Sequence, residues 1–516
     1  MPNDAGCSVQ AEARSTLDRL DYVIEDCLHR ARAAPPFEGR AASAHGQSRT
    51  NLLHYLALRE QDHRELQKAL AELGLSSLGR CEPAVLHNLA MARHAAGRLI
   101  DPPVTPPEPD APGISLARGR TILDHRTEAL LGPRPTARAV RIMVTMPTEA
   151  AQPGGDDLIA RLLRAGMDAA RINTAHDDPA DWRTMIRTIR DQDPEHRCRI
   201  FMDLAGPKIR ITALRKHAKP RDHVRLALAD RCCIRTTTPP PAPDTQDSLK
   251  DPALGIEIWT ETPDALRDLR PGHAVWFDDG KIGCRVLETH ADRIELEVTD
   301  AKPGGQRLRT GRGLNLPDTP LDCPALTDDD RRAVRDFAAE VDAFCLSFVN
   351  RPEDVRDLAS WIGDAAHPGQ HPAIVLKIET RRGFERLPEL LVALLEVDRG
   401  GVMIARGDLA VEVGFARLAE VQEEILWLCE AAHTPVIWAT EVLASLAKHG
   451  LPVRGEVTDA AMGQRAECVM LNKGPRILQA VGALSDILSR MELHQRKKMS
   501  TLRPLRIAAP PNHTEP

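Results

Sequence analysis

The sequence is poor in aromatic side chains and has no long apolar run. Only 3% of its 516 residues are aromatic, and acidic residues outnumber basic ones by 74 to 68. It therefore lacks the stacking surfaces and the bulk positive charge that nucleic-acid-binding proteins use. No stretch of 18 apolar residues occurs, so no segment is expected to span a membrane. We expect neither a nucleic-acid partner nor a membrane partner.

Signals for disulfide frameworks, zinc sites and secretion are also missing. The eleven cysteines are scattered without a Cys-x-x-Cys pair, the spacing typical of zinc and redox sites. The N-terminus has no basic start followed by an apolar segment, so it does not resemble a signal peptide. We expect a reduced, cytoplasmic protein of enzyme size. The Gly-x-x-x-x-Gly-Lys-[Ser/Thr] loop is absent too, so any phosphoryl transfer uses another scaffold.

The first hundred residues have the apolar periodicity of helices. The stretch DPPVTPPEPDAP at 101–112 cannot continue a helix, because proline fixes φ and lacks the backbone N–H. We therefore predict an N-terminal helical domain over 1–101, followed by a Pro-rich linker over 102–135. The three predicted helices span residues 15–34, 51–73 and 83–100.

From residue 136 onward, short β-rich runs alternate with amphipathic segments. Eight such runs favour a (β/α)₈ TIM barrel, an α/β fold, although an open doubly wound sheet of similar size is also compatible with the pattern. The barrel is expected over 136–209 and 313–500, and residues 501–516 are expected to form a disordered tail. The strand candidates are residues 141–146, 169–173, 200–204, 343–348, 374–379, 402–405, 436–440 and 468–471.

The gap between the third and fourth runs, residues 210–312, has a different pattern. Apolar and polar residues alternate in it as in half-buried strands, and Asp278-Asp279-Gly280 is a turn signal. The segment TTTPPPAPDTQDS indicates one disordered loop. We predict a small β-barrel domain inserted into the larger barrel.

Polar residues interrupt the predicted strands where each strand ends. In a TIM barrel the carboxyl ends of the strands form the mouth at which active sites are built. Alternation along a strand also places Lys377 and Glu379 on one face. So many polar strand ends are hard to explain by packing alone. The residues concerned are Arg171, Asn173, Asp203, Ser347, Lys377, Glu379, Arg406, Asp408, Thr440 and Asn472.

The charges of this ring predict its ligands. Glu379 and Asp408 supply two carboxylates from successive strands, enough to hold Mg²⁺ or Mn²⁺. Cations beside a hard metal ion suit an anionic substrate that carries phosphate or carboxylate groups. The cations expected at the mouth are Arg171, Lys208, Arg210, Lys377 and Arg406.

Several segments resemble the pyruvate kinase family. AGMDAARINTAH (165–176) is similar to the family's AGMNVARLNFSH, and MDLAGPKIR (202–210) is similar to LDTKGPEIR. The resemblance covers about Arg141 to Met491 and is most specific at LKIET and ARGDL. It implies a barrel A domain with a B domain inserted after the third strand as a lid. It also implies Mg²⁺-dependent phosphoryl transfer from phosphoenolpyruvate to ADP, giving pyruvate and ATP in glycolysis.

The resemblance further implies a role for each matched residue. Lys377 would neutralise the transferring phosphoryl group and the enolate, and Glu379 and Asp408 would hold the metal ion. The implied catalytic residues are Lys377, Thr440 and Arg171, and the implied substrate-binding residues are Arg171, Ser347, Lys377, Gly407, Asp408 and Thr440. The implied nucleotide-binding residues are Asn173, His176, Arg210, Asp279 and Arg312.

The chain departs from the family pattern at the monovalent-cation site. Of its four oxygen-bearing residues, Asn173 and Asp203 are present, whereas Ala175 and Leu204 replace the other two. Lys208 stands where many members have Glu, and its ammonium could supply the missing positive charge. We predict that Lys208 is a monovalent-cation surrogate and that activity does not require K⁺.

Other departures keep alternative functions open. The loop after the eighth strand reads MLNKGPRI instead of the usual MLSGETAKG, and the chain is expected to lack the family's C-terminal domain. The N-terminal helices are an addition, expected to serve packing or homo-oligomerisation. The alternatives are a metal-dependent lyase of the phosphoenolpyruvate-binding barrel type and a catalytically impaired regulatory pseudokinase. A lyase would need neither the inserted domain nor Lys377, and the intact charged set argues against the pseudokinase.

Overall fold

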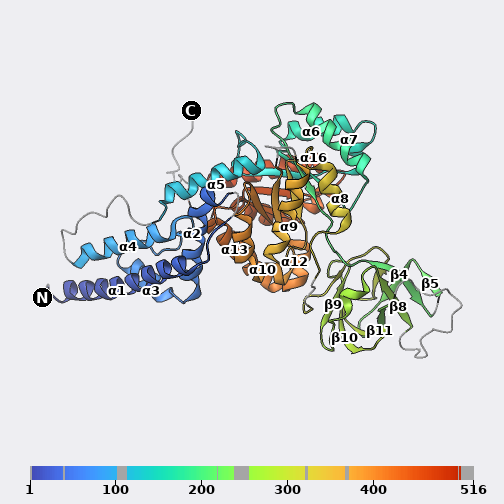
Figure 1. Cartoon of the computed structure of the whole chain (residues 1–516), viewed down its shortest axis with the longest axis horizontal. Coiled ribbons are helices and arrows are strands. Elements are labelled where there is room, and N and C mark those ends of the chain that lie inside the picture. Colours follow the sequence, from blue (N-terminus) through green and yellow to red (C-terminus); the bar gives the residue numbers. More distant parts are fainter. Residues whose placement is uncertain are drawn as a thin grey trace, which may run out of the picture.

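The computed structural model has three regions arranged along its long axis (Figure 1). Helices from the N-terminal part lie at one end, a barrel of strands and helices lies in the middle, and a β domain lies at the other end. The predicted tail at 501–516 lies outside the described residues, as does most of the predicted disordered loop. The structure describes residues 3–38, 41–100, 113–217, 219–237, 255–319, 323–366, 371–497 and 499–500.

Eight parallel strands close into a barrel, which confirms the predicted TIM-barrel fold. The ring closes because β1 pairs in parallel with both β2 and β18. The strands are almost entirely buried, as expected for parallel strands covered by helices. In chain order they are β1 (Arg141–Thr145), β2 (Ala169–Asn173), β3 (Arg199–Asp203), β14 (Ala343–Leu346), β15 (Ala373–Ile378), β16 (Gly400–Ala405), β17 (Val436–Ala439) and β18 (Cys468–Leu471).

Helices surround these strands and present their apolar faces to them. α8 shows how the sequence sets a helix start: Thr327 Oγ1 accepts the N–H of Asp330, whose carboxylate accepts the N–H of Thr327. The helices are α6 (Gly155–Ala165), α7 (Pro179–Gln192), α8 (Asp328–Phe337), α9 (Pro352–Ala365), α10 (Arg381–Glu385), α11 (Leu387–Leu394), α12 (Arg406–Val413), α13 (Phe415–Ala431), α14 (Ala444–His449), α15 (Arg454–Met462) and α16 (Ile477–Glu492).

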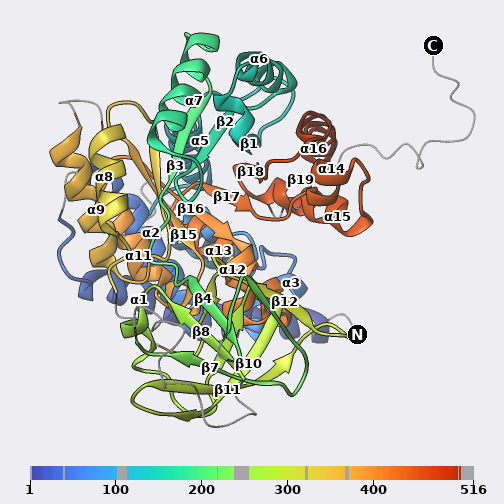
Figure 2. The same cartoon turned by 90° about the vertical axis from the view of Figure 1, so that its right-hand side faces the viewer.

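The inserted region is a β domain with its own buried apolar core. It lies on the α12 side of the barrel, away from α6 and α7 (Figures 1 and 2). One eight-stranded mixed sheet, with β13 and β5 at its edges, is accompanied by a ribbon of β6 and β12. The strands are β4 (Ile211–Lys216), β5 (Lys219–Arg221), β6 (His223–Leu226), β7 (Arg231–Arg235), β8 (Ile256–Thr260), β9 (Ala274–Phe277), β10 (Ile282–Thr289), β11 (Arg293–Asp300), β12 (Gln306–Arg309) and β13 (Leu314–Asn315).

The N-terminal region is helical, as predicted. The single helix expected over 51–73 is instead two helices, because Gln61 adopts an extended conformation (φ −115°, ψ 161°). The helices are α1 (Asn3–Ala33), α2 (Ala42–Glu60), α3 (Arg64–Glu72), the short 3₁₀ helix η1 (Glu82–Ala84) and α4 (Val85–Ile100). No helix among the described residues is long and apolar enough to cross a bilayer.

The expectation of a linker over 102–135 is wrong for its second half, which forms helix α5 (Leu116–Leu131). Ser115 caps this helix by accepting the N–H of Arg118 over 3.2 Å. Leu130 and Leu131 are buried with the inward side chains of the barrel strands. α5 therefore closes the end of the barrel at which the strands begin. Its apolar residues do not form a clean helical stripe, which explains why the sequence pattern missed it.

Candidate active site

A cavity of about 400 Å³ opens at the carboxyl ends of the barrel strands, beside the β domain. The thirteen residues to which the family resemblance or the cation argument assigned a site role all line it. They come from β2, β15 and the segments that follow β3, β14, β16 and β17, and from the β domain. The thirteen are Arg171, Asn173, His176, Lys208, Arg210, Asp279, Arg312, Ser347, Lys377, Glu379, Gly407, Asp408 and Thr440.

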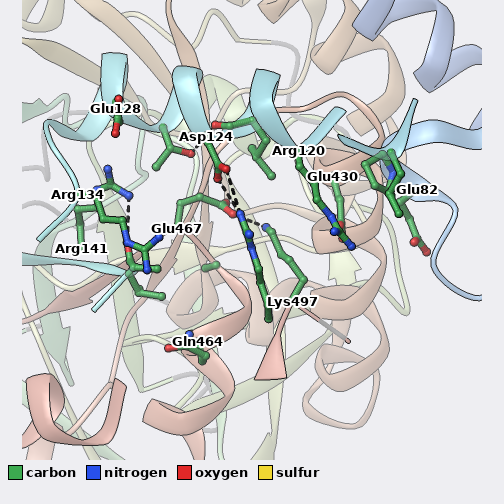
Figure 3. Close-up of a pocket in the computed structure, with 18 of the residues that line it drawn as sticks. Glu82, Arg120, Asp124, Glu128, Arg134, Arg141, Glu430, Gln464, Glu467 and Lys497 are labelled. Carbon is green, nitrogen blue, oxygen red and sulfur yellow. Dashed lines mark hydrogen bonds and ion pairs between the residues drawn. The ribbon is translucent and has the colours of Figure 1, made fainter. Parts of the chain in front are cut away.

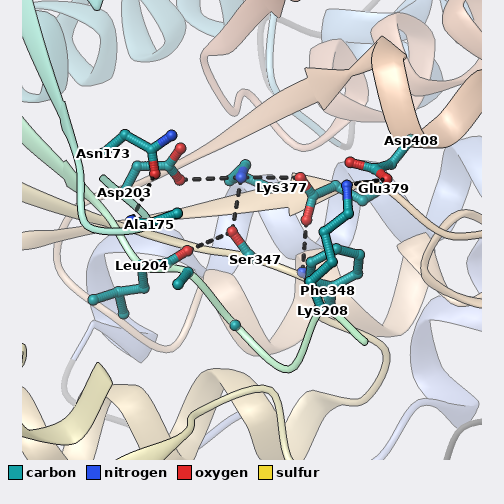
Figure 4. Close-up of polar contacts among 12 residues, drawn as sticks. Asn173, Ala175, Asp203, Leu204, Lys208, Ser347, Phe348, Lys377, Glu379 and Asp408 are labelled. Carbon is teal, nitrogen blue, oxygen red and sulfur yellow. Dashed lines mark hydrogen bonds and ion pairs between the residues drawn. The ribbon is translucent and has the colours of Figure 1, made fainter. Parts of the chain in front are cut away.

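Lys377 is the centre of a buried polar network in this cavity (Figure 4). Its Nζ donates to Ser347 Oγ over 2.7 Å. The same Nζ lies 2.9 Å from Glu379 Oε1 and 3.1 Å from Asp203 Oδ1. Burial acts to lower the pKa of Lys377, but the two carboxylates outweigh it and raise that pKa. The network therefore keeps the ammonium charged at the mouth of the barrel.

Arg171 and Asp203 form a further buried ion pair of the cavity. Arg171 Nε donates to Asp203 Oδ2 over 2.8 Å, Nη2 contacts the same oxygen, and Nη1 donates to Thr145 Oγ1 over 3.1 Å. Burial acts to raise the pKa of Asp203, but Arg171 and Lys377 together lower it. Asp203 is therefore a carboxylate whose charge is balanced by two cations, and it fixes both of them in place.

Glu379 and Asp408 have the chemistry of a divalent-metal pair. Glu379 Oε2 accepts the N–H of Phe348 over 2.8 Å. Burial is the main cause that raises the pKa of Glu379, and the nearby Asp408 carboxylate raises it further. A hard cation stabilises a buried carboxylate such as Glu379 beside a second carboxylate, so the oxygen donors present fit Mg²⁺ or Mn²⁺.

Such an ion would draw only part of its ligands from the protein. Within the described ranges, no group of three or more His, Cys, Asp and Glu side chains is placed to hold a metal ion. The remaining ligands would therefore come from substrate and water, as is usual for Mg²⁺ at phosphate-binding sites.

Lys208 lies on the side of Asp408, whereas the predicted monovalent-cation residues Asn173 and Asp203 lie on the other side of Lys377 (Figure 4). Its Nζ donates to Asp408 Oδ1 over 2.8 Å and to Asp279 Oδ1 over 3.1 Å. Asn315, a residue that the sequence argument missed, donates its Nδ2 to the same Asp408 oxygen over 3.1 Å. Asn315 lies only three residues after the expected Arg312, and this closeness is the sequence signal that could have identified it.

The predicted nucleotide-side residues surround the opening between barrel and β domain. Asn173 Oδ1 accepts the N–H of Ala175 over 3.1 Å, which shapes the loop that leads to His176. Burial, followed by the Lys473 charge, lowers the pKa of His176. Arg210 and Arg312 lie on the two chain segments that connect the β domain to the barrel, and Arg312 pairs with Asp278 at 3.4 Å.

Thr440 and Gly407 lie in close contact where β17 ends and α12 begins. Thr440 has a φ of +74°, in the left-handed region that few non-glycine residues adopt. A methyl group added to Gly407 would lie 2.9 Å from Thr440 Cγ2. Arg406 holds the strained turn by donating to the carbonyl oxygens of Ala439 and Thr440.

The expectation that Arg406 contributes a cation to the mouth is wrong. Arg406 does not line the cavity. It pairs with Asp459 and lies 4.6 Å from the centre of the Trp438 ring. The Asp459 carboxylate thus neutralises the charge of Arg406 below the turn, and Arg406 supports the backbone around Thr440.

A second cavity, of about 210 Å³, lies at the opposite end of the barrel (Figure 3). It lies between α5, the starts of β1 and β18, and a terminal hairpin of β19 (Gln495–Arg496) and β20 (Met499–Ser500). Its charges pair across these elements: Arg496 contacts Asp124 at 3.0 Å, and Lys497 contacts Glu467. No sequence pattern indicated this cavity, because its charges come from segments that are far apart in the chain.

Comparison with known proteins agrees with this geometry. Residues 137–475, more than half of the chain, match the family described as pyruvate kinase, barrel domain. The pyruvate kinase of Thermotoga maritima is 31% identical over 345 residues, which cover 65% of this chain and 68% of that protein. The pyruvate kinase of Methylorubrum extorquens is 30% identical over 366 residues, 69% of each chain. Pyruvate kinase 1 of Trypanosoma brucei brucei is 30% identical over 322 residues, 61% of this chain and 59% of that protein. With a closed barrel, an inserted β domain and this match, the chain belongs to the pyruvate kinase family, whose members are phosphotransferases.

Proposed function

We propose that this protein transfers the phosphoryl group of phosphoenolpyruvate to ADP and releases pyruvate and ATP. The observation that carries this proposal is the buried Lys377, held charged by Glu379 and Asp203 at the mouth of the barrel. In the reaction the bond between phosphorus and the enol oxygen breaks, and a bond forms to a β-phosphate oxygen of ADP. The enolate left behind takes a proton on carbon and becomes pyruvate. This is the reaction of glycolysis that forms pyruvate.

The residues of the cavity can support each part of this reaction. Phosphoryl transfer depends on positioning and on neutralising charge rather than on covalent chemistry. Lys377 stabilises both the phosphoryl oxygens and the developing enolate, and Arg171 holds a phosphate from the other side. A divalent ion on Glu379 and Asp408 supplies charge neutralisation when bound. Thr440, held in its strained turn, would direct its hydroxyl towards the substrate carboxylate and the path of the proton.

The β domain and the segments that lead to it contribute further charged residues to the cavity. Arg210, Arg312 and Asp279 approach the cavity from this side, where the phosphates of ADP would be bound. When the β domain covers the mouth it excludes water, which strengthens the ionic interactions inside and protects the phosphoryl group from hydrolysis. A lyase of the phosphoenolpyruvate-binding type has no use for such a cover, so the structure favours the kinase among the enzyme hypotheses.

The proposed activity does not require K⁺. Ala175 and Leu204 offer no side-chain oxygen to a monovalent ion, and Asp203 is already balanced by Arg171 and Lys377. The Asp203 carboxylate therefore does not require a further cation. Lys208 brings one more fixed positive charge to the cavity from the opposite side.

The proposal is tested by measuring pyruvate formation from phosphoenolpyruvate with ADP and Mg²⁺. We expect ADP-dependent pyruvate from the natural protein and a loss of at least about a thousandfold in kcat for Lys377→Met, since a buried charge aimed at the transition state is removed. Lys448→Met, at an exposed helix end, is the matched control and should retain full activity. Pyruvate formed without ADP would mean that water, not ADP, accepts the phosphoryl group and would overturn the proposal. No pyruvate from the natural protein would leave only the lyase and the pseudokinase.

A further inference from the structure

One cation of the cavity joins two parts of the molecule. Lys208 lies on the segment that leaves β3 for the β domain. Its ammonium donates to Asp408 at the start of α12, on the barrel, and to Asp279 in the turn between β9 and β10 of the β domain. The charge therefore links the barrel carboxylate expected to bind metal to the tip of the β domain.

This ammonium is enclosed by close packing. The Lys208 side chain is 16% exposed. A methyl group on Gly313 would lie 2.4 Å from Lys208 Cε, and one on Gly280 would lie 2.9 Å from Val411 Cγ2. Two glycines thus let the lysine stem and the turn of the β domain approach the barrel closely. A larger side chain at Gly313 would push the Lys208 stem aside, and one at Gly280 would push the turn away from Val411.

Lys208 remains charged in this position. Its Nζ lies 2.8 Å from Asp408 Oδ1 and 3.1 Å from Asp279 Oδ1, and two carboxylates at such distances stabilise the ammonium form. A divalent cation bound by Asp408 would therefore meet a full positive charge that already contacts the same carboxylate. At such short range two cations repel strongly, and the carboxylate oxygen that accepts from Lys208 and Asn315 has little capacity left.

We propose that Lys208 is a built-in counter-ion of Asp408 that a divalent cation must displace. Metal binding then breaks the contact between Lys208 and Asp408 and so removes the ionic link between the turn at Asp279 and the barrel. The Asn315 contact with Glu412 and the packing of Gly280 on Val411 remain, so the β domain is held more loosely when metal is bound than when it is absent. This inference rests on the proposed metal site at Glu379 and Asp408, and it concerns a step that precedes phosphoryl transfer.

The proposal is tested by titrating the full chain with Mn²⁺ in the absence of substrates. The electron paramagnetic resonance signal of the free ion measures how much Mn²⁺ remains unbound. Mn²⁺ accepts the same oxygen ligands as Mg²⁺. Lys208→Gln should bind Mn²⁺ about tenfold more tightly than the natural protein, because a charge-assisted hydrogen bond no longer competes for Asp408. Lys208→Met, which keeps an apolar stem against Gly313, should show the same gain and serves if the first variant is unfolded.

Matched controls separate this effect from a general change of charge. Lys281→Gln removes a lysine from the same turn, where it contacts Asp278 at 3.1 Å but no barrel residue, and should bind Mn²⁺ like the natural protein. Lys208→Arg keeps the charge and should also leave the affinity unchanged. Amide hydrogen exchange at residues 278–281 should rise on Mn²⁺ addition in the natural protein and should already be high in Lys208→Gln.

The outcomes distinguish the inference from the function on which it rests. Equal Mn²⁺ affinity in the natural protein and Lys208→Gln, with binding lost in Glu379→Gln, overturns the counter-ion while the metal site stands. Tighter binding without any change in exchange at residues 278–281 overturns the proposed loosening of the β domain. Absence of Mn²⁺ binding in every variant overturns the metal site and this inference together.

Discussion

The contact between Gly407 and Thr440 shows how little room the candidate site has. Gly407→Ala would place a methyl group 2.9 Å from Thr440 Cγ2, and Thr440 cannot yield easily because its backbone is already in the left-handed region. We expect a fall in kcat/KM for phosphoenolpyruvate of about a hundredfold, with a small change in stability. Steady-state kinetics and a thermal melt measure the two effects. Gly455→Ala, at a position with open space around it, is the control, and equal kinetics for both variants would argue against this contact.

The ionic balance around Asp203 leads to a prediction about salts. Because Arg171 and Lys377 both contact this carboxylate, turnover in potassium chloride and in tetramethylammonium chloride at equal ionic strength should agree within about twofold. Replacing Leu204 with Thr restores one missing oxygen and should leave the activity in tetramethylammonium unchanged. An absolute need for K⁺ would contradict the proposed balance.

At this scale the sequence predicted which residues share the cavity, because strand ends of a closed barrel must converge. It could not predict how their charges pair. Arg406 was expected at the mouth, but Asp459, 53 positions away in the chain, draws it beneath the turn. Lys208 was expected near Asn173, but two carboxylates on the other side hold it. The apolar periodicity of a sequence places a side chain on a helix or strand, but it does not predict which charged group that side chain will pair with.

The junction between α2 and the barrel is built from buried polar groups. His433, which follows α13, is fully buried, with its ring nitrogens 3.0 Å from Ser48 Oγ and 3.0 Å from the carbonyl oxygen of Pro83. Asn51 donates to the carbonyl oxygens of Glu82 and Ala431 and accepts from Val85 N. These bonds fix how the N-terminal helices lie against the barrel.

This junction should weaken in acid. Burial lowers the pKa of His433 from 6.5 to about 4. Because the folded pKa lies below the unfolded one, the unfolded chain takes up the proton first, so stability falls as the pH drops from 6.5 towards 4. The loss attributable to His433 approaches about 3 kcal/mol. His433→Gln should flatten the dependence of the urea midpoint between about pH 7.5 and pH 5, whereas His29→Gln, on an exposed face, should not. An unchanged slope in His433→Gln would count against this account.

Among the elements, the eight strands were predictable because each is a short apolar run that ends in polar residues. Helix α5 was not predictable, because contacts with other parts of the fold stabilise it. Leu130 and Leu131 are buried against the barrel interior, and a window of local sequence does not include that interior. The split between α2 and α3 was missed for a similar reason, since the apolar spacing continues across Gln61 while the backbone turns away.

The stability of the whole molecule depends on its N-terminal helices. A chain that begins at residue 113 would leave His433 and the carbonyl of Ala431 without the partners that α2 and η1 supply, together with the apolar surface that packs against α13. Each abandoned buried polar group costs about 1–3 kcal/mol. We expect the shortened chain to melt at least about 5 °C lower than the full chain and to aggregate. Differential scanning fluorimetry with light scattering measures both, and an unchanged melting temperature would contradict the prediction.

For the whole molecule, changes in composition and apolar periodicity along the sequence predicted the order of the regions, but they did not predict the contacts between them. The second cavity illustrates the limit, because α5, two strand starts and the terminal hairpin meet there, and nothing in the spacing of their charges predicts the meeting. Arrangement in space is decided by burial that only the assembled fold provides.

The β domain is attached to the barrel through two chain segments that pair with each other. Leu314 N donates to the oxygen of Ile209, and Ile211 N donates to the oxygen of Arg312, with Arg210 opposite Gly313. A two-stranded ribbon bends easily across its face but resists shear along its plane, so the β domain can swing about one axis and hardly slide. Arg210 and Arg312 sit on that ribbon and travel with it. A single hinge angle should therefore describe the domain's motion and, with it, how far both arginines reach into the cavity.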